Sequence, residues 1–225
     1  MSFLRFVGFV AEKLNLLLVV FYSASGGDGG GAASTGDNAM SEAWRMARDA
    51  VLSEVLAISG GSIAGLLLAS MLNILQQHPS IAILIPAFLG LRGDILGATS
   101  ARLGTALHTG LLEPKLGMNR KLLEDFSASL FLGVLESAWI GFITHITCLF
   151  FDIRSLGLFR LILLCSLGGF ISTVVLTPIT IAMAILTFRY GIDPDSVVGP
   201  IIMRLGDIVG ALCLLISVYL VLGGA

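Results

Sequence analysis

Long apolar stretches follow one another from Val51 to Ala225, and they limit the possible folds more than any other feature of the chain. Each stretch has about twenty or more residues, the length that an α-helix needs to cross about 30 Å of hydrocarbon. Only 12% of the residues are charged, whereas a soluble domain has about 25%. The sequence therefore predicts an all-α polytopic membrane protein and excludes an ordinary soluble domain.

Five transmembrane helices are predicted in this region. Because the number is odd, the two ends of the region lie on opposite sides of the membrane. We place the helices at Glu54–Leu75, Ile81–Thr109, Asp125–Phe151, Phe159–Phe188 and Pro194–Leu222.

Basic residues in the connections predict the orientation, because Lys and Arg gather in cytoplasmic loops. The side that carries Ser41 has six of them, and the opposite side has Arg154 and Arg160. The six are Arg45, Arg48, Lys115, Arg120, Lys121 and Arg189. We therefore expect an integral protein of the plasma membrane, with the segment before Ser41 in the cytoplasm and Ala225 outside.

Residues 1–22 form a separate apolar segment with Glu12 and Lys13 near its middle. A charge at the centre of a membrane span costs about 2.5–3.5 kcal/mol even on lenient scales. We therefore favour a helix on the membrane surface, with a short signal sequence and an extra span as alternatives. Residues 23–40 are rich in Gly and Ser and are predicted to form a flexible linker. The five-helix domain then comprises residues 41–225.

Two segments inside the predicted spans match each other. Pro86–Gly97 reads PAFLGLRGDILG and Pro200–Gly210 reads PIIMRLGDIVG, so both end in Gly-Asp-Ile-(Leu/Val)-Gly. Because the second and fifth spans run in opposite directions, the match is typical of an inverted repeat, with spans 1–2 and 4–5 around span 3. Asp94 and Asp207 would both lie near the middle of the bilayer.

These motifs contain the residue types that an ion path requires. Pro86 and Pro200 each remove a helical hydrogen bond, and Gly93 and Gly206 let backbone approach a ligand. We expect interrupted spans whose freed carbonyls join the aspartate carboxylates in an all-oxygen lining. Such a lining suits hard cations such as Mg²⁺ or Ca²⁺.

A purely structural interpretation stays open at this point. Asp94 and Asp207 could pair with the nearby Arg92 and Arg204 and do no more than stabilise helix contacts. The glycines could equally serve close helix packing. Against this, carboxylates inside membrane spans are rare and are usually functional.

Four further residues are weaker candidates for the ion path. Glu136 lies inside the third span and could assist the path or accept an internal hydrogen bond. Asp193 and Asp195 lie at the start of the fifth span, where they could cap the helix or attract cations. Arg102 could anchor the second span at the membrane interface or modify the electrostatics of the path.

At Ile85–Gly110 and Asp193–Gly210 the sequence resembles the two signature stretches of the MgtE family of magnesium channels and transporters, closest in motif to its eukaryotic solute-carrier relatives. The resemblance extends from about Ser41 onward. It implies a Mg²⁺ path that the second and fifth spans line at a homodimer interface, with Asp207 binding the partly hydrated ion. The family usually has asparagine where this chain has Asp94, which adds negative charge.

Mg²⁺ would be both the transported and the bound ion, and we expect no organic cofactor. The expected partners are membrane lipid and a second copy of the chain. No catalytic motif and no polybasic run is present in the sequence, so we expect neither an enzyme nor nucleic-acid binding. Two alternatives remain, a Mg²⁺ exchanger coupled to Na⁺ or H⁺ and a membrane scaffold that transports nothing.

Overall fold

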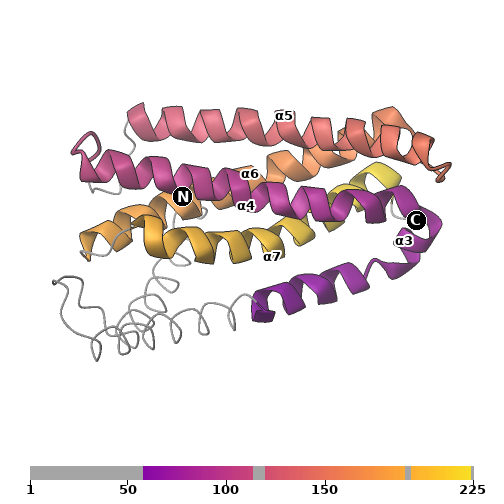
Figure 1. The fold of residues 1–225 in the computed structure, drawn as a ribbon, viewed down its shortest axis with the longest axis horizontal. Helices are drawn as coiled ribbons and strands as arrows, with labels where there is room; N and C mark the ends of the chain where they lie inside the picture. Colours follow the sequence, from indigo (N-terminus) through magenta and orange to yellow (C-terminus); the bar gives the residue numbers. More distant parts are fainter. Residues whose placement is uncertain (1–57, 114–119, 191–193, 224–225) are drawn as a thin grey trace, which may run out of the picture.

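The computed structural model describes residues 58–113, 120–190 and 194–223, and the regular structure within these ranges is helical. Four long helices run side by side along the long axis (Figure 1). Each contains an apolar stretch long enough to cross a membrane. The expected all-α membrane fold is confirmed at this level. The four helices are α4 (Pro79–His108), α5 (Arg120–Phe150), α6 (Leu158–Arg189) and α7 (Pro194–Leu222).

The first predicted span differs from the expected single helix. From Ile58 onward the structure has a helix over Ile58–Ala69, a turn at Ser70 and Met71, and the short helix α3 (Leu72–Gln77). The backbone N–H of Met71 bonds three residues back, to Leu68, which tightens the last turn. The Met71 side chain is 1% exposed and packs in an apolar cluster with residues of α4, α6 and α7. The break therefore coincides with the point where this side chain packs against the long helices.

The expected interruption of the two motif helices is wrong. α4 continues through Pro86, and α7 continues through Pro200. A proline removes one hydrogen bond from a helix, and neighbouring helices can hold the remaining turns in place. Because both helices are continuous, an ion site here would be built from side chains on unbroken helices rather than from unwound backbone.

α5 buries mainly small and polar residues and exposes large apolar residues. Its buried positions recur at spacings of three or four and are Leu122, Asp125, Ser129, Gly133, Ser137, Gly141, Thr144 and Cys148. Phe131, Leu135 and Trp139 are exposed. Small residues let helices approach closely in a membrane, where large apolar side chains can face lipid. This pattern places α5 at the periphery of the bundle.

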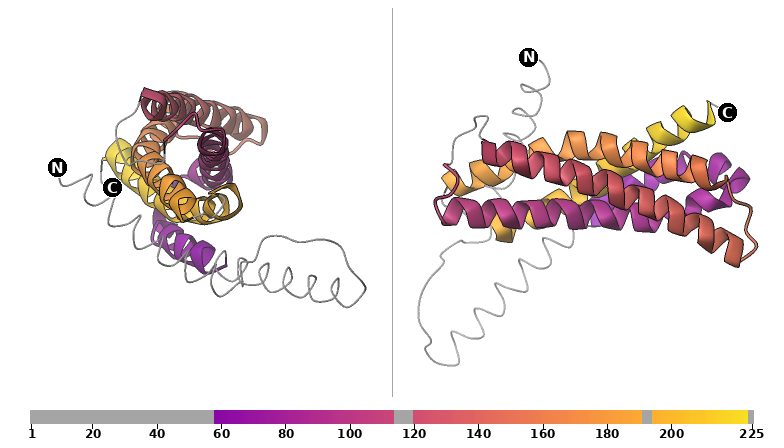
Figure 2. Two further views of the ribbon diagram at one scale, coloured as in Figure 1. Left: turned by 90° about the vertical axis from the view of Figure 1, so that its left-hand side faces the viewer. Right: turned by 90° about the horizontal axis from the view of Figure 1, so that it is seen from above.

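α6 packs against α4, α5 and α7, and α4 likewise contacts the three other long helices (Figure 2). Buried residues of α6 and α7 form one apolar cluster with Leu96 of α4, and a second cluster around Phe88 joins the same three helices nearer the other end. α4 and α7 run in opposite directions and lie against each other (Figure 1). The bundle thereby brings the two matching motifs into contact.

Several predicted features lie outside the described residues. They are the apolar segment 1–22, the linker 23–40 and Asp193. The side chains of Asp195 and Pro200 belong to α7 but are also outside the described part.

Candidate functional site between α4 and α7

The two Gly-Asp motifs meet where α4 and α7 pack together. Both Gly93 and Gly206 are buried. A methyl group on Gly93 would lie 3.5 Å from the Cγ atom of Met203, and one on Gly206 would lie 3.3 Å from the Cδ1 atom of Leu96. These glycines therefore bring the helices close together, as the packing interpretation expected. The contact sets the positions of the aspartates that follow them.

Asp94 lies near the middle of α4 and is exposed. Within the described part of the chain it has no hydrogen bond or ion pair. It belongs to a row of exposed residues at helical spacing that we call the outer face of α4, comprising Pro86, Ala87, Gly90, Asp94 and Ala98. Apart from the aspartate, the row consists of glycine, alanine and proline. The bundle therefore directs one carboxylate outward at mid-height on a surface of small residues.

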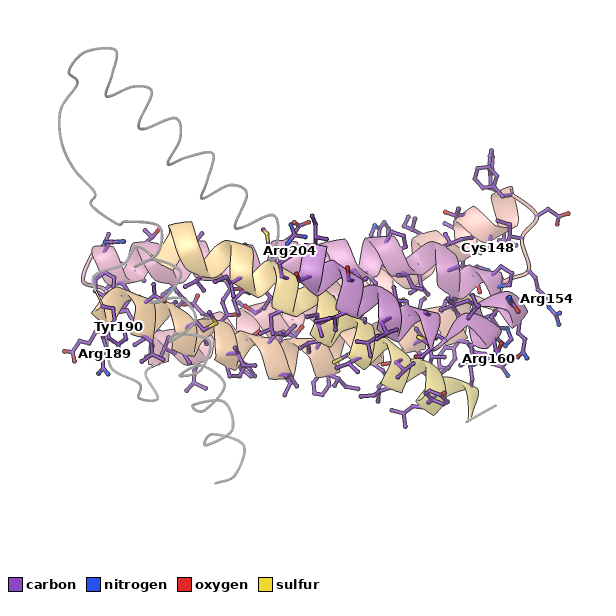
Figure 3. The ribbon with its side chains drawn as sticks, turned by 90° about the horizontal axis from the view of Figure 1, so that it is seen from below. Cys148, Arg154, Arg160, Arg189, Tyr190 and Arg204 are labelled. Atoms are coloured by element: carbon purple, nitrogen blue, oxygen red, sulfur yellow. The ribbon has the colours of Figure 1, made fainter. Side chains whose placement is uncertain are left out.

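Asp207 is partly buried and forms a loose ion pair on its own helix. Its Oδ2 atom lies 3.7 Å from Nη1 of Arg204, and the two side chains are 25% and 47% exposed. Residues three apart share a helix face, which explains the pairing. Figure 3 places Arg204 between the two ends of the bundle. The pairing of Asp207 with Arg204 in the structural alternative is therefore present.

The pairing of Asp94 with Arg92 in the same alternative is wrong. Arg92 is 2% exposed and its guanidinium points into the bundle, where it bonds to α5 and α6. Its Nη2 atom donates to Ser137 Oγ at 2.6 Å, and Nη1 donates to Ser172 Oγ at 3.0 Å. These two serines were not among the residues predicted from the sequence. The repeated four-residue spacing of Gly133, Ser137 and Gly141 was the available signal.

The weaker candidates fall around this central region. Glu136 is half-buried, attracts the Arg92 charge electrostatically, and has one buried carboxylate oxygen without a hydrogen-bond partner in the described residues. Arg102 lies two turns beyond Asp94, and its Nη2 atom donates to Thr99 Oγ1 at 3.3 Å and to Ser129 Oγ at 3.5 Å. Arg102 thus links α4 to α5.

The described part of one copy holds no cluster of three metal-ligating side chains. Among residues 58–113, 120–190 and 194–223, no three His, Cys, Asp or Glu side chains gather closely enough to hold an ion. The three cysteines are buried and unpaired with one another, and they pack as small apolar residues. The chemistry available here is that of carboxylate oxygens on two packed helices.

A family model for divalent cation transporters, MgtE, matches residues 85–217, which is more than half of the chain. The chain belongs to the MgtE family. The match begins within α4, ends within α7 and contains both Gly-Asp motifs. MgtE proteins are transporters rather than enzymes, in agreement with the absence of catalytic motifs from the sequence. The expected resemblance from about Ser41 onward is thus supported over most of its length.

Curated relatives of this MgtE protein include members of solute carrier family 41. Member 3 of Mus musculus is 26% identical over 171 residues, which cover 71% of this chain and 33% of the relative. Member 2 of Xenopus laevis is 24% identical over 143 residues, which cover 61% of this chain and 25% of the relative. Member 2 of Homo sapiens is 26% identical over 143 residues, which cover 61% of this chain and 24% of the relative. The chain therefore spans about a quarter to a third of the length of these relatives.

Proposed function

We propose that this protein transports divalent cations, Mg²⁺ in particular, along a path that α4 and α7 line between two copies of the chain. Asp207 is the principal ion ligand and Asp94 is its companion. The observation that carries the proposal is the exposed Asp94 carboxylate at mid-height of a membrane helix, without a partner in the described residues. Such a carboxylate facing lipid costs about 2.5–3.5 kcal/mol even on lenient scales.

A second copy would cover this carboxylate and add the missing ligands. Two-fold symmetry places the same surface on both partners, so a dimer that joins the outer faces of α4 would bring two Asp94 carboxylates together. The small residues of the outer face favour close approach of another helix. The dimer therefore supplies carboxylates that a single described chain does not gather.

The donor set favours a hard divalent ion. Carboxylate oxygens suit Mg²⁺, which sheds water reluctantly and is usually held by one or two carboxylates with several waters retained. Conduction also requires binding weak enough for release. The opposite directions of α4 and α7 and the match between their motifs support a five-helix transport domain at 41–225 with an inverted repeat, spans 1–2 and 4–5 around span 3.

The distribution of basic residues supports the proposed orientation in the plasma membrane. Arg154 and Arg160 lie at one end of the bundle, and Arg189 lies at the other (Figure 3). The Arg189 end also carries the start of α5, with Arg120 and Lys121. Because cytoplasmic loops are enriched in Lys and Arg, we place the Arg189 end in the cytoplasm and Ala225 outside.

Uptake into vesicles tests the proposed function. The purified full chain is reconstituted into lipid vesicles that contain a Mg²⁺-sensitive dye, and Mg²⁺ is added outside. We expect uptake without any Na⁺ or pH gradient, and none in protein-free vesicles. Uptake only under an imposed Na⁺ or pH gradient would instead indicate a coupled exchanger. No uptake under either condition would contradict transport and favour a scaffold.

Changing Asp94 to asparagine should weaken Mg²⁺ binding without abolishing transport. The amide keeps an oxygen ligand but loses the charge, and charged hydrogen bonds are about twice as strong as neutral ones. A loss of about 1 kcal/mol corresponds to about fivefold in affinity. We expect the half-saturating Mg²⁺ concentration for uptake to rise by about that factor. Asp152→Asn, at an exposed loop residue, is the control, and equal values for both variants would contradict a role for Asp94.

Changing Arg204 to glutamine should have the opposite effect on Mg²⁺ affinity. Arg204 competes with the ion for the Asp207 carboxylate at 3.7 Å. Exposed ion pairs contribute about 0.2–1 kcal/mol, so their removal improves affinity by at most about fivefold. We expect the half-saturating Mg²⁺ concentration to fall by up to that factor in the uptake assay. A rise would show that Arg204 supports ion binding rather than opposing it.

A further inference from the structure

The guanidinium of Arg92 is buried and surrounded by oxygen atoms of neighbouring helices. Arg92 is among the largest fully buried side chains of the described residues, and its guanidinium carbon lies 4.9 Å from the centroid of the Phe88 ring. Five oxygens from α5 and α6, which we call the oxygen cradle, accept its hydrogen bonds. They are the carbonyls of Gly133 (3.3 Å) and Gly169 (3.2 Å) and the hydroxyls of Ser137 (2.6 Å), Ser172 (3.0 Å) and Thr173 (3.2 Å).

The cradle depends on close contact between α5 and α6. A Cβ atom on Gly133 would collide with Thr173 Oγ1, and one on Gly169 would collide with Ser137 Oγ. Glycine at both positions leaves the carbonyl oxygens accessible to the guanidinium. The site is therefore built from both helices at once, and a planar group with several fixed donors can bridge them.

This arrangement fixes the rotation of α4 about its axis. Residues two apart on an α-helix lie about 200° apart around it, so Asp94 faces outward when Arg92 faces the cradle. The stem of Arg92 also borders α7, because a methyl group on Gly210 would lie 3.3 Å from Arg92 Cγ and one on Gly206 would lie 3.7 Å from Arg92 Cβ. One side chain thus joins α4 to the three other long helices.

We propose that Arg92 is the positioning residue of the ion path. The oxygen cradle on α5 and α6 binds its guanidinium and fixes the rotation of α4, which turns Asp94 toward the path. The inference rests on the proposed function. Burying a charge for stability alone is unfavourable, because well-packed apolar side chains often do as well or better. Arg92 instead combines a specific rotation of α4 with a fixed positive charge beside Glu136. Arg92 acts on the transported ion through Asp94 and touches no ion itself.

The first test asks whether Arg92 acts through Asp94. Arg92→Lys keeps the charge but loses the planar set of donors, so it cannot bond to both helices as arginine does. We expect the half-saturating Mg²⁺ concentration for uptake to rise by about tenfold, with the maximal rate retained. In an Asp94→Asn background the same change should raise it by less than about twofold, because the two residues are coupled. Equal rises in both backgrounds would overturn the proposal.

Arg160→Lys is the matched control, since Arg160 is exposed at the start of α6. We expect it to leave the half-saturating concentration unchanged in both backgrounds. A tenfold rise in this variant would show that the effect of Arg92→Lys is not specific to the cradle, and would also overturn the proposal.

The second test reports the rotation of α4 and needs no transport. The Cβ positions of Gly93 and Met203 lie 3.8 Å apart, the usual spacing in a disulfide. The pair Gly93→Cys with Met203→Cys should therefore cross-link within one chain under mild oxidation in membranes. We expect Arg92→Lys, and Arg92→Met as an apolar variant of similar length, to slow this cross-link by at least about fivefold. Each single cysteine variant is the control for the buried native cysteines.

The two tests separate failure of this inference from failure of the proposed function. Unchanged cross-linking in both Arg92 variants would overturn the positioning role, even if vesicles take up Mg²⁺. Slowed cross-linking in membranes, combined with no Mg²⁺ uptake by vesicles of the purified protein, would support the positioning of α4 by Arg92 and contradict the transport proposal. Because membranes are tested without purification, the measurement does not depend on a variant surviving extraction.

Discussion

Changing Asp207 to asparagine is expected to abolish Mg²⁺ uptake by vesicles that contain the purified protein. Asp207 lies at mid-height of α7, next to Gly206 in the contact with α4. Its carboxylate is only partly buried and is held loosely, with Arg204 at 3.7 Å. A hydrated divalent ion can therefore displace this partner. A neutral amide cannot compensate the ion for the hydration that it loses on entering the path, as the charged carboxylate does. The initial rate of uptake should therefore fall to that of protein-free vesicles.

Glu124→Gln is the matched control for this change. Glu124 is an exposed acid at the start of α5, where it pairs with Arg120 at 3.2 Å. Its loss removes one negative charge from the protein without touching the α4–α7 contact. We expect uptake at the unchanged rate. Full retention of uptake by Asp207→Asn, with both proteins present in equal amounts, would contradict the assignment of Asp207.

The largest expected effect on stability comes from Gly141→Ala. Gly141 is buried where α5 crosses the start of α6, and an added methyl group would lie 2.7 Å from the carbonyl oxygen of Leu161 and 2.8 Å from the Cα atom of Ile162. Both are backbone atoms, so no side-chain rotation can relieve the collision. Overpacking of this kind typically costs about 1–3 kcal/mol. We expect the purified protein in detergent to unfold at a clearly lower temperature.

Gly61→Ala provides the comparison for this prediction. A methyl group on Gly61 would meet none of the described residues within 4 Å, and alanine is favoured over glycine inside a helix by about 0.5–1 kcal/mol. We expect its unfolding temperature to equal or exceed that of the unmodified protein. Equal unfolding temperatures for Gly141→Ala and the unmodified protein would show that α5 and α6 can move apart without loss of stability, which would contradict the prediction.

The four long helices could be predicted from the sequence because length and hydropathy decide whether a segment spans a membrane. The second span was predicted at Ile81–Thr109 and is found at Pro79–His108. The third was predicted to begin at Asp125 and begins at Arg120, because charged residues can continue a helix beyond the apolar stretch. The break at Ser70 and Met71 was not predicted, because hydropathy continues across it and its position coincides with a contact that forms only in the assembled bundle.

The candidate site was predictable in part. The repeated Gly-Asp motif marked two helices that pack against each other, and their close contact involves the glycines. The proposed pairing of Arg92 with Asp94 overlooked a geometric rule, because residues two apart on a helix do not face each other. The oxygen cradle around Arg92 depends on how α5 aligns with α6, and that alignment is set by packing between helices rather than by either sequence segment alone.

The most direct test of the transport path is a structure of the full chain determined with Mg²⁺ at a resolution that defines ion–oxygen distances. We expect two copies joined at the outer faces of α4, with density for a cation near Asp207 and Asp94. Oxygen distances of about 2.1 Å would indicate direct ligation, and about 4 Å or more a hydrated ion. A single copy whose outer face of α4 meets lipid, without cation density near Asp207 at saturating Mg²⁺, would contradict it.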